Sequence, residues 1–153
     1  MTELTPPERD AIAHWAHYGK PGDPVTERYI PDEAERARFK DFVAPQNGVW
    51  PDRFDAAQTL LLLNGFPRGA MEDKWIIYSD DPRPDGTTSV HFHRSWTGLQ
   101  VVQVDLALDA DGSRCVGATW EMDTETLKNP SEAFARESFV EVCRWVLRMK
   151  PAD

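Results

Sequence analysis

The run Val90-His91-Phe92-His93-Arg94-Ser95-Trp96-Thr97-Gly98 has the composition of a β-strand that ends at a glycine. Successive side chains of a strand point to opposite faces of the sheet. One face is therefore expected to carry His91, His93 and Ser95, and the other Val90, Phe92, Arg94 and Trp96. A strand that served only packing would not need so many hydrogen-bond donors, so this run is also the first place to look for a functional site.

Three further segments around this run are rich in Val, Ile, Thr and aromatic residues, which favour strands. The four predicted strands span residues 74–79, 88–96, 99–109 and 113–122. Their connections are too short for crossover helices, and Asp111-Gly112 is typical of a tight hairpin turn. The sequence therefore predicts a four-stranded antiparallel meander.

Helical patterns lie on both sides of this predicted sheet. Thr5-Pro6-Pro7-Glu8 has the form of a capping box for a first helix, and further helices are expected over 33–43 and 52–64. A last helix opens at Asn129-Pro130-Ser131-Glu132, and its apolar stripe consists of Ala135, Phe139, Val142, Val146 and Met149. We expect a single α+β domain over 1–153, with N-terminal helices in 1–68 and, in 70–153, the sheet with the C-terminal helix packed on it.

Charge and hydropathy narrow the classes of partner and compartment. The 153 residues include 26 acidic and 17 basic ones, for a net charge of −9, which opposes nonspecific binding to nucleic acid or an anionic membrane. No apolar run approaches the ~20 residues of a membrane span, and the N-terminus lacks the features of a signal peptide. The expected compartment is the cytoplasm, where Cys115 and Cys143 would be buried thiols.

The segment from Arg94 to Gly98 carries groups that suit an anionic ligand. The guanidinium of Arg94 matches a phosphate or carboxylate, Ser95 and Thr97 add hydroxyls, and Gly98 permits a close backbone approach. Trp96 could stack on a base or a sugar. The alternative is structural: Arg94 pairs with a surface carboxylate, Trp96 lies in the core, and Thr97-Gly98 only turns the chain.

The two histidines of the strand suggest a second chemistry. His91 and His93 could both bind a ligand or a metal, with Asp105 or Glu121 as a third ligand. Because catalytic zinc needs at least three protein ligands and only two occur together, we assign no metal and no cofactor. His93 is the best candidate for an acid or base, since the usual pKa of histidine is close to neutrality. No phosphate loop, nucleophile elbow or HExxH motif is present, so enzymatic activity is left open.

The run Met71-Glu72-Asp73-Lys74-Trp75-Ile76-Ile77-Tyr78, followed by Phe92-His93-Arg94-Ser95-Trp96-Thr97-Gly98, resembles a group of small bacterial domains. Some members of that group occur beside macro domains or other ADP-ribose-related proteins. The resemblance covers residues 71–108 and implies that Arg94, Ser95 and Thr97 belong to a family signature.

Three functions follow from these patterns. The preferred one is binding or processing of an anionic, phosphate-bearing small molecule such as an ADP-ribose-like nucleotide, held by His91, His93, Arg94, Ser95, Trp96 and Thr97. The second is an acidic protein-binding module of the immunity or antitoxin type, which would cover a basic protein partner. The third is a metal-dependent enzyme that uses His91 and His93.

Overall fold

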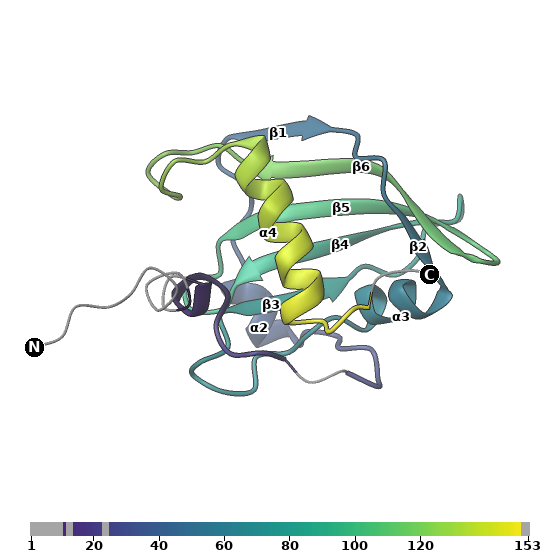
Figure 1. Cartoon of the computed structure of the whole chain (residues 1–153), viewed down its shortest axis with the longest axis horizontal. Helices are drawn as coiled ribbons and strands as arrows, with labels where there is room; N and C mark the ends of the chain where they lie inside the picture. The colour runs from purple at the N-terminus through teal and green to yellow at the C-terminus, as the bar shows by residue number, and fades with distance from the viewer. Residues whose placement is uncertain (1–10, 12–13, 23–24, 151–153) are drawn as a thin grey trace, which may run out of the picture.

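The structure, a computed structural model, describes residues 11, 14–22 and 25–150 (Figure 1). The elements follow one another as α2 (Glu33–Arg38), β1 (Pro45–Gly48), β2 (Arg53–Asp55), α3 (Ala56–Asn64), β3 (Trp75–Ser79), β4 (Thr87–Arg94), β5 (Gln100–Asp109), β6 (Gly112–Glu121) and α4 (Glu132–Trp145). Ala11 and residues 14–18 are also helical, whereas the predicted capping box at Thr5 lies outside the described residues. The α+β class is therefore confirmed.

The sheet is antiparallel and has the strand order β1-β6-β5-β4-β3, with β2 also paired to β6. The predicted meander is confirmed as β3 to β6, but the expectation of four strands was wrong, because the described sheet has six. The two extra strands pair with β6 along its length: β1 with its C-terminal part and β2 with its N-terminal part. The sequence of β1, Pro-Gln-Asn-Gly, contains no strand-forming side chain. Its pairing is therefore imposed by the neighbouring strand.

Two predicted helices are shorter than expected, for local reasons. α3 begins at Ala56, because Asp55 forms a capping box with Gln58 and the residues before it join the sheet as β2. α2 ends at Arg38, because Phe39 is extended and the amide of Lys40 bonds to the carbonyl of Gly98 at 2.9 Å. The chain after α2 is thus held against the turn that follows β4.

The core lies between the sheet and α4, which crosses the front of the sheet in Figure 1. Ala135, Phe139 and Val142 of α4 are buried, and the rings of Phe139 and Phe92 meet at a centroid distance of 5.5 Å. The predicted C-terminal helix on the sheet is confirmed, and its stripe continues into the buried Val146 and Met149. None of the helices in the described ranges is long and apolar enough to cross a membrane.

The other face of the sheet is polar and lies against α2 and the segment that follows it. Phe39, next to the end of α2, stacks on Tyr78 of β3 with ring centroids 5.1 Å apart. The predicted thiols Cys115 and Cys143 are both buried and free.

Candidate functional site

The run that ends at Gly98 is a strand only as far as Arg94. The next four residues form a turn, in which the amide of Gly98 bonds to the carbonyl of Arg94 at 2.8 Å and Gly98 has a φ of 75°. Thr97 is exposed, and its hydroxyl accepts a bond from the amide of Leu99 at 3.3 Å. The turn distributes the predicted site residues over both faces of the sheet instead of gathering them at one point.

Arg94 lines a cavity of about 510 Å³ on the α4 side of the sheet. The residues around this Arg94 cavity are His17, Arg94, Val101, Thr126, Leu127, Lys128, Asn129 and Phe134. The guanidinium of Arg94 lies over the ring of Trp75, 4.9 Å from its centroid, and donates to the backbone carbonyl of His17. Its position is therefore fixed by an aromatic ring and by the N-terminal helical segment.

The charge of the Arg94 cavity is opposite to that of the whole protein. None of its lining residues is acidic, and Arg94 forms no ion pair with any carboxylate of the described residues. Arg94 is half-buried, and this burial lowers the pKa of its guanidinium. A half-buried guanidinium without a counterion is available to bind an anion.

His17 is the titratable neighbour of Arg94 in this cavity. Burial, followed by the charge of Arg94, lowers the pKa of His17 from 6.5 to about 4. Its Nε2 lies 3.3 Å from the hydroxyl of Ser138 on α4. At neutral pH His17 is therefore uncharged, and Arg94 and Lys128 carry the positive charge of the cavity.

His91 lies on the opposite face, and both of its ring nitrogens are engaged. Its Nδ1 accepts from the side-chain amide of Gln100 at 2.8 Å, and its Nε2 donates to Asp80 at 2.9 Å. Further polar side chains on this face are also hydrogen-bonded to one another: the side-chain amide of Gln103 donates to Asp105 at 3.0 Å. His91 is therefore part of a hydrogen-bonded polar row and has no free nitrogen for a ligand.

His93 is also on that face and is only 2% exposed. Its Nδ1 donates to the carbonyl of Gly98 at 2.9 Å, and its ring stacks on Phe39 with a centroid distance of 4.6 Å. Its Nε2 is buried without a hydrogen-bond partner in the described part of the chain. Burial lowers the pKa of His93 to about 4, so the ring is neutral at pH 7.

The two residues considered as a third metal ligand, Asp105 and Glu121, accept hydrogen bonds from other groups of the protein. Asp105 accepts from the hydroxyl of Ser89 at 2.6 Å, and Glu121 accepts from the amides of Val43 and Ala44 at 2.7 and 2.8 Å. In the ranges that the structure describes, no three His, Cys, Asp or Glu side chains come together to hold a metal ion. The described residues therefore give no geometric support to the metal-dependent enzyme.

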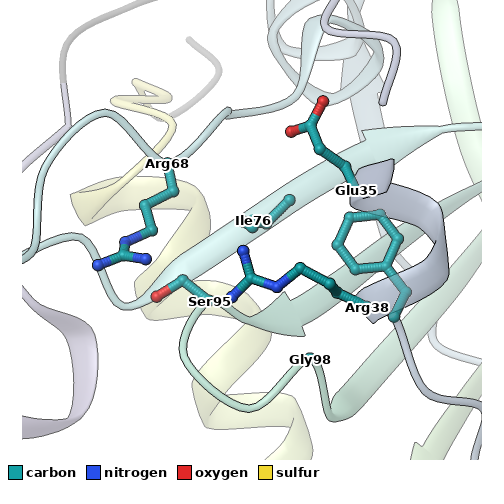
Figure 2. Close-up of a pocket in the computed structure, with 7 residues that line it drawn as sticks. Glu35, Arg38, Arg68, Ile76, Ser95 and Gly98 are labelled. Atoms are coloured by element: carbon teal, nitrogen blue, oxygen red, sulfur yellow. The ribbon is translucent and has the colours of Figure 1, made fainter. Parts of the chain in front are cut away.

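Ser95 borders a second cavity of about 160 Å³ on the face opposite α4. Its residues, shown in Figure 2, are Glu35, Arg38, Phe39, Arg68, Ile76, Ser95 and Gly98. Beside it, Trp96 is 54% exposed, which excludes the core position considered from the sequence. The indole of Trp96 donates to the carbonyl of Met71 at 3.1 Å, and Lys74 and Arg68 lie 4.7 and 5.6 Å from its ring centroid.

Sequence reasoning identified Arg94 but missed the residues that surround it. Lys128 and Asn129 reach the cavity from the connection that leads into α4, and His17 reaches it from the N-terminal helix. The sequence indicated this cavity only weakly: the pair Lys128-Asn129 lies directly before Pro130-Ser131, where a helix is expected to open. Arg38 and Arg68, which line the second cavity, lie in segments with no recognisable ligand-binding motif.

Comparison with known proteins gives no information on the family or the function of this chain. The chain matches no protein-family model, no curated protein and no solved structure. The resemblance over residues 71–108 therefore stays a prediction, and the functional argument rests on the geometry of the two cavities.

Proposed function

We propose that this protein binds a small, phosphate-bearing anion in the Arg94 cavity. The observation that carries the proposal is the half-buried guanidinium of Arg94, which lines the cavity and pairs with no carboxylate of the described residues. Holding such a charge away from water is costly unless an anion compensates it in the working state. A ligand phosphate would supply that compensation through charge-assisted hydrogen bonds.

The size and polarity of the cavity favour an organic phosphate. About 510 Å³ lies within the usual range of small-molecule sites, roughly 300–1,000 Å³. Lys128 adds a second cation, Thr126 and Asn129 add polar groups that can fix orientation, and Phe134 adds an aromatic surface. An ADP-ribose-like nucleotide, which combines phosphates with a flat base, has the matching chemistry.

This proposal changes the residues assigned to the site. Arg94 is kept, whereas His91 and His93 are on the opposite face, so His17 takes their place as the titratable group near the ligand. A bound phosphate would stabilise protonated His17 and raise its pKa from about 4 toward the usual value. The proposed function is binding, and no catalytic step is assigned.

The test is calorimetric titration with ADP-ribose, AMP, NAD and inorganic phosphate. Arg94→Met keeps the long side chain over Trp75 but removes the charge, and Arg114→Met is the control because Arg114 is exposed on β6. Loss of charge-assisted bonds worth roughly 1.5–3 kcal/mol predicts about 10- to 100-fold weaker binding for Arg94→Met and no change for the control.

Two outcomes would contradict the proposal. Equal affinity of wild type and Arg94→Met would place the ligand elsewhere on the molecule. Absence of binding across the whole panel would favour the alternative function, an acidic module that covers a basic protein partner. In that case the next measurement would be a search for such a partner.

A further inference from the structure

We propose that the second cavity is an independent phosphate site, with Arg38 and Arg68 as its two ligands. The site lies on the face of the sheet opposite the Arg94 cavity, and the argument for it does not depend on the function proposed above. Its ligand is a single phosphate group, either free or as the end of a small phosphate monoester.

The two guanidinium groups come from different parts of the chain and meet at one space. Arg38 is the last residue of α2, and Arg68 lies in the connection between α3 and β3. Figure 2 shows both side chains reaching toward Ser95, with Ile76 of β3 behind them. Two planar guanidinium groups that approach from different sides can each form paired hydrogen bonds with a tetrahedral oxyanion.

Neither guanidinium is paired with a carboxylate in the part of the chain that the structure describes. Arg38 and Arg68 form no ion pair with any carboxylate in the described ranges. Within the described ranges the one hydrogen bond of the Arg68 guanidinium is from Nε to the carbonyl of Ala70 at 3.2 Å. Its two terminal nitrogens therefore remain available for an oxyanion.

Glu35, the acidic residue of this cavity, has its carboxylate committed to other donors. One oxygen accepts from the amide of Asp32 at 3.1 Å, and the other accepts from the hydroxyl of Tyr29. In Figure 2 the carboxylate of Glu35 points away from the guanidinium of Arg38. The space between the two arginines therefore keeps its positive charge.

The dimensions of the cavity limit the ligand. About 160 Å³ is below the range of sites that enclose a drug-sized molecule, but it can hold one phosphate group. Phe39 and Ile76 supply apolar walls, which strengthen the electrostatic interaction by excluding water. Outside the cavity, the exposed ring of Trp96 could contact the organic part of a monoester.

The backbone that carries Arg38 and the guanidinium of Arg68 both contact the turn after β4 before any ligand binds. A Cβ atom at Gly98 would lie 2.0 Å from the carbonyl oxygen of Arg38, so the end of α2 touches the turn directly. On the other side, the guanidinium of Arg68 lies over the ring of Trp96. Such preorganisation reduces the ordering cost of binding.

The test is a titration followed by ¹H–¹⁵N NMR spectra, with inorganic phosphate and with phenyl phosphate as probes. We expect both probes to shift the amide signals of Ser95 and Gly98 at millimolar concentration, and only phenyl phosphate to shift the indole signal of Trp96. Arg38→Gln and Arg68→Gln should each weaken phosphate binding about fivefold or more, and the double variant should abolish it. Arg114→Met, which removes an exposed arginine of β6, is the matched control and should leave these shifts unchanged.

The proposal would be overturned by any of three results. Ser95 and Gly98 could fail to shift at about 20 mM phosphate, which corresponds to negligible affinity. Their shifts could persist in a folded double variant. Finally, the shifts could be confined to Val101 and Asn129 and be lost in Arg94→Met, which would assign phosphate to the Arg94 cavity alone and leave that first proposal intact.

Discussion

His93 is a histidine whose surroundings favour the neutral ring. Its ring packs against those of Phe39 and Tyr78, with centroid distances of 4.6 and 5.6 Å, and is 2% exposed. The carbonyl of Gly98 accepts a hydrogen bond from Nδ1–H, and Nε2 has no partner among the described residues that could accept a hydrogen bond from it once it is protonated. Burial therefore opposes protonation of the His93 ring in the folded protein, and it is the main cause of the low pKa.

The replacement His93→Phe should flatten the dependence of stability on pH. The pKa of His93 is about 4 in the folded protein and 6.5 as an ordinary value, so the unfolded state binds more protons between these limits. Its contribution to stability is complete above pH 6.5 and is lost as pH falls toward 4, which amounts to roughly 2 kcal/mol between pH 7 and pH 5. Urea unfolding at both pH values measures this, and equal losses in wild type and variant would contradict it.

The alternation rule predicted the face of most residues in the run from Val90 to Gly98, but not their partners. It placed His91 and His93 together and Arg94 opposite them, which the structure confirms. It failed for Trp96, because the strand ends at Arg94 and the turn places that ring at the surface. A turn at Thr97-Gly98 was one of the two interpretations of the sequence, but nothing in the local pattern indicated that the strand ends before Ser95. The turn is stabilised by contacts with Lys40 and Lys74, which are distant in sequence.

At the scale of elements, β3 to β6 and α4 were predictable because each carries its own signal. The strands have β-branched and aromatic residues, and α4 has both a cap and an apolar stripe. β1 and β2 had no such signal: one is polar, and the other is only three residues long and ends at Asp55, the cap of α3. Their pairing with β6 depends on tertiary contacts, which outweigh local propensity.

The contact between α2 and the turn after β4 depends on a glycine. Gly98 combines a φ of 75° with the close approach to Arg38, so Gly98→Ala adds a steric clash to the cost of the backbone conformation. We expect a loss of about 2–4 kcal/mol in the free energy of unfolding. Gly86→Ala is the control, because its φ is 82° but the nearest atom to a Cβ lies 4.0 Å away, which predicts a loss of about 1 kcal/mol. Equal losses of unfolding free energy in the two variants would show that the close approach of Gly98 to Arg38 adds nothing to the cost of the backbone conformation.

At the scale of the whole molecule, the local charge at the two cavities is opposite in sign to the net charge of the chain. The chain has a net charge of −9, yet each face of the sheet has a cavity where arginines have no carboxylate partner in the described part. Arg94 serves one cavity and Ser95 with Gly98 the other, so one turn contributes to both. The surrounding negative charge should repel large polyanions, whereas a small anion can be bound by local guanidinium groups.

The layers of the molecule are joined by the pair of Arg136 on α4 and Asp52 before β2. Two nitrogens of Arg136 donate to Asp52, one of them at 2.6 Å, and its guanidinium lies 5.1 Å from the ring centroid of Trp50. Arg136→Gln would leave the partly buried Asp52 without its cation, so we expect a loss of roughly 2 kcal/mol in the free energy of unfolding.

The control for Arg136→Gln is Arg53→Gln, which breaks the exposed pair of Arg53 and Asp109 at 3.0 Å. That pair is 61% and 36% exposed in its two side chains, against 33% and 21% for Arg136 and Asp52. Exposed pairs contribute at most about 1 kcal/mol, so the control should be close to wild type in urea unfolding. Equal effects of the two substitutions would mean that α4 is held by its apolar stripe alone. A larger effect of Arg136→Gln would show that this pair helps to hold the helix against the sheet, over which the Arg94 cavity lies.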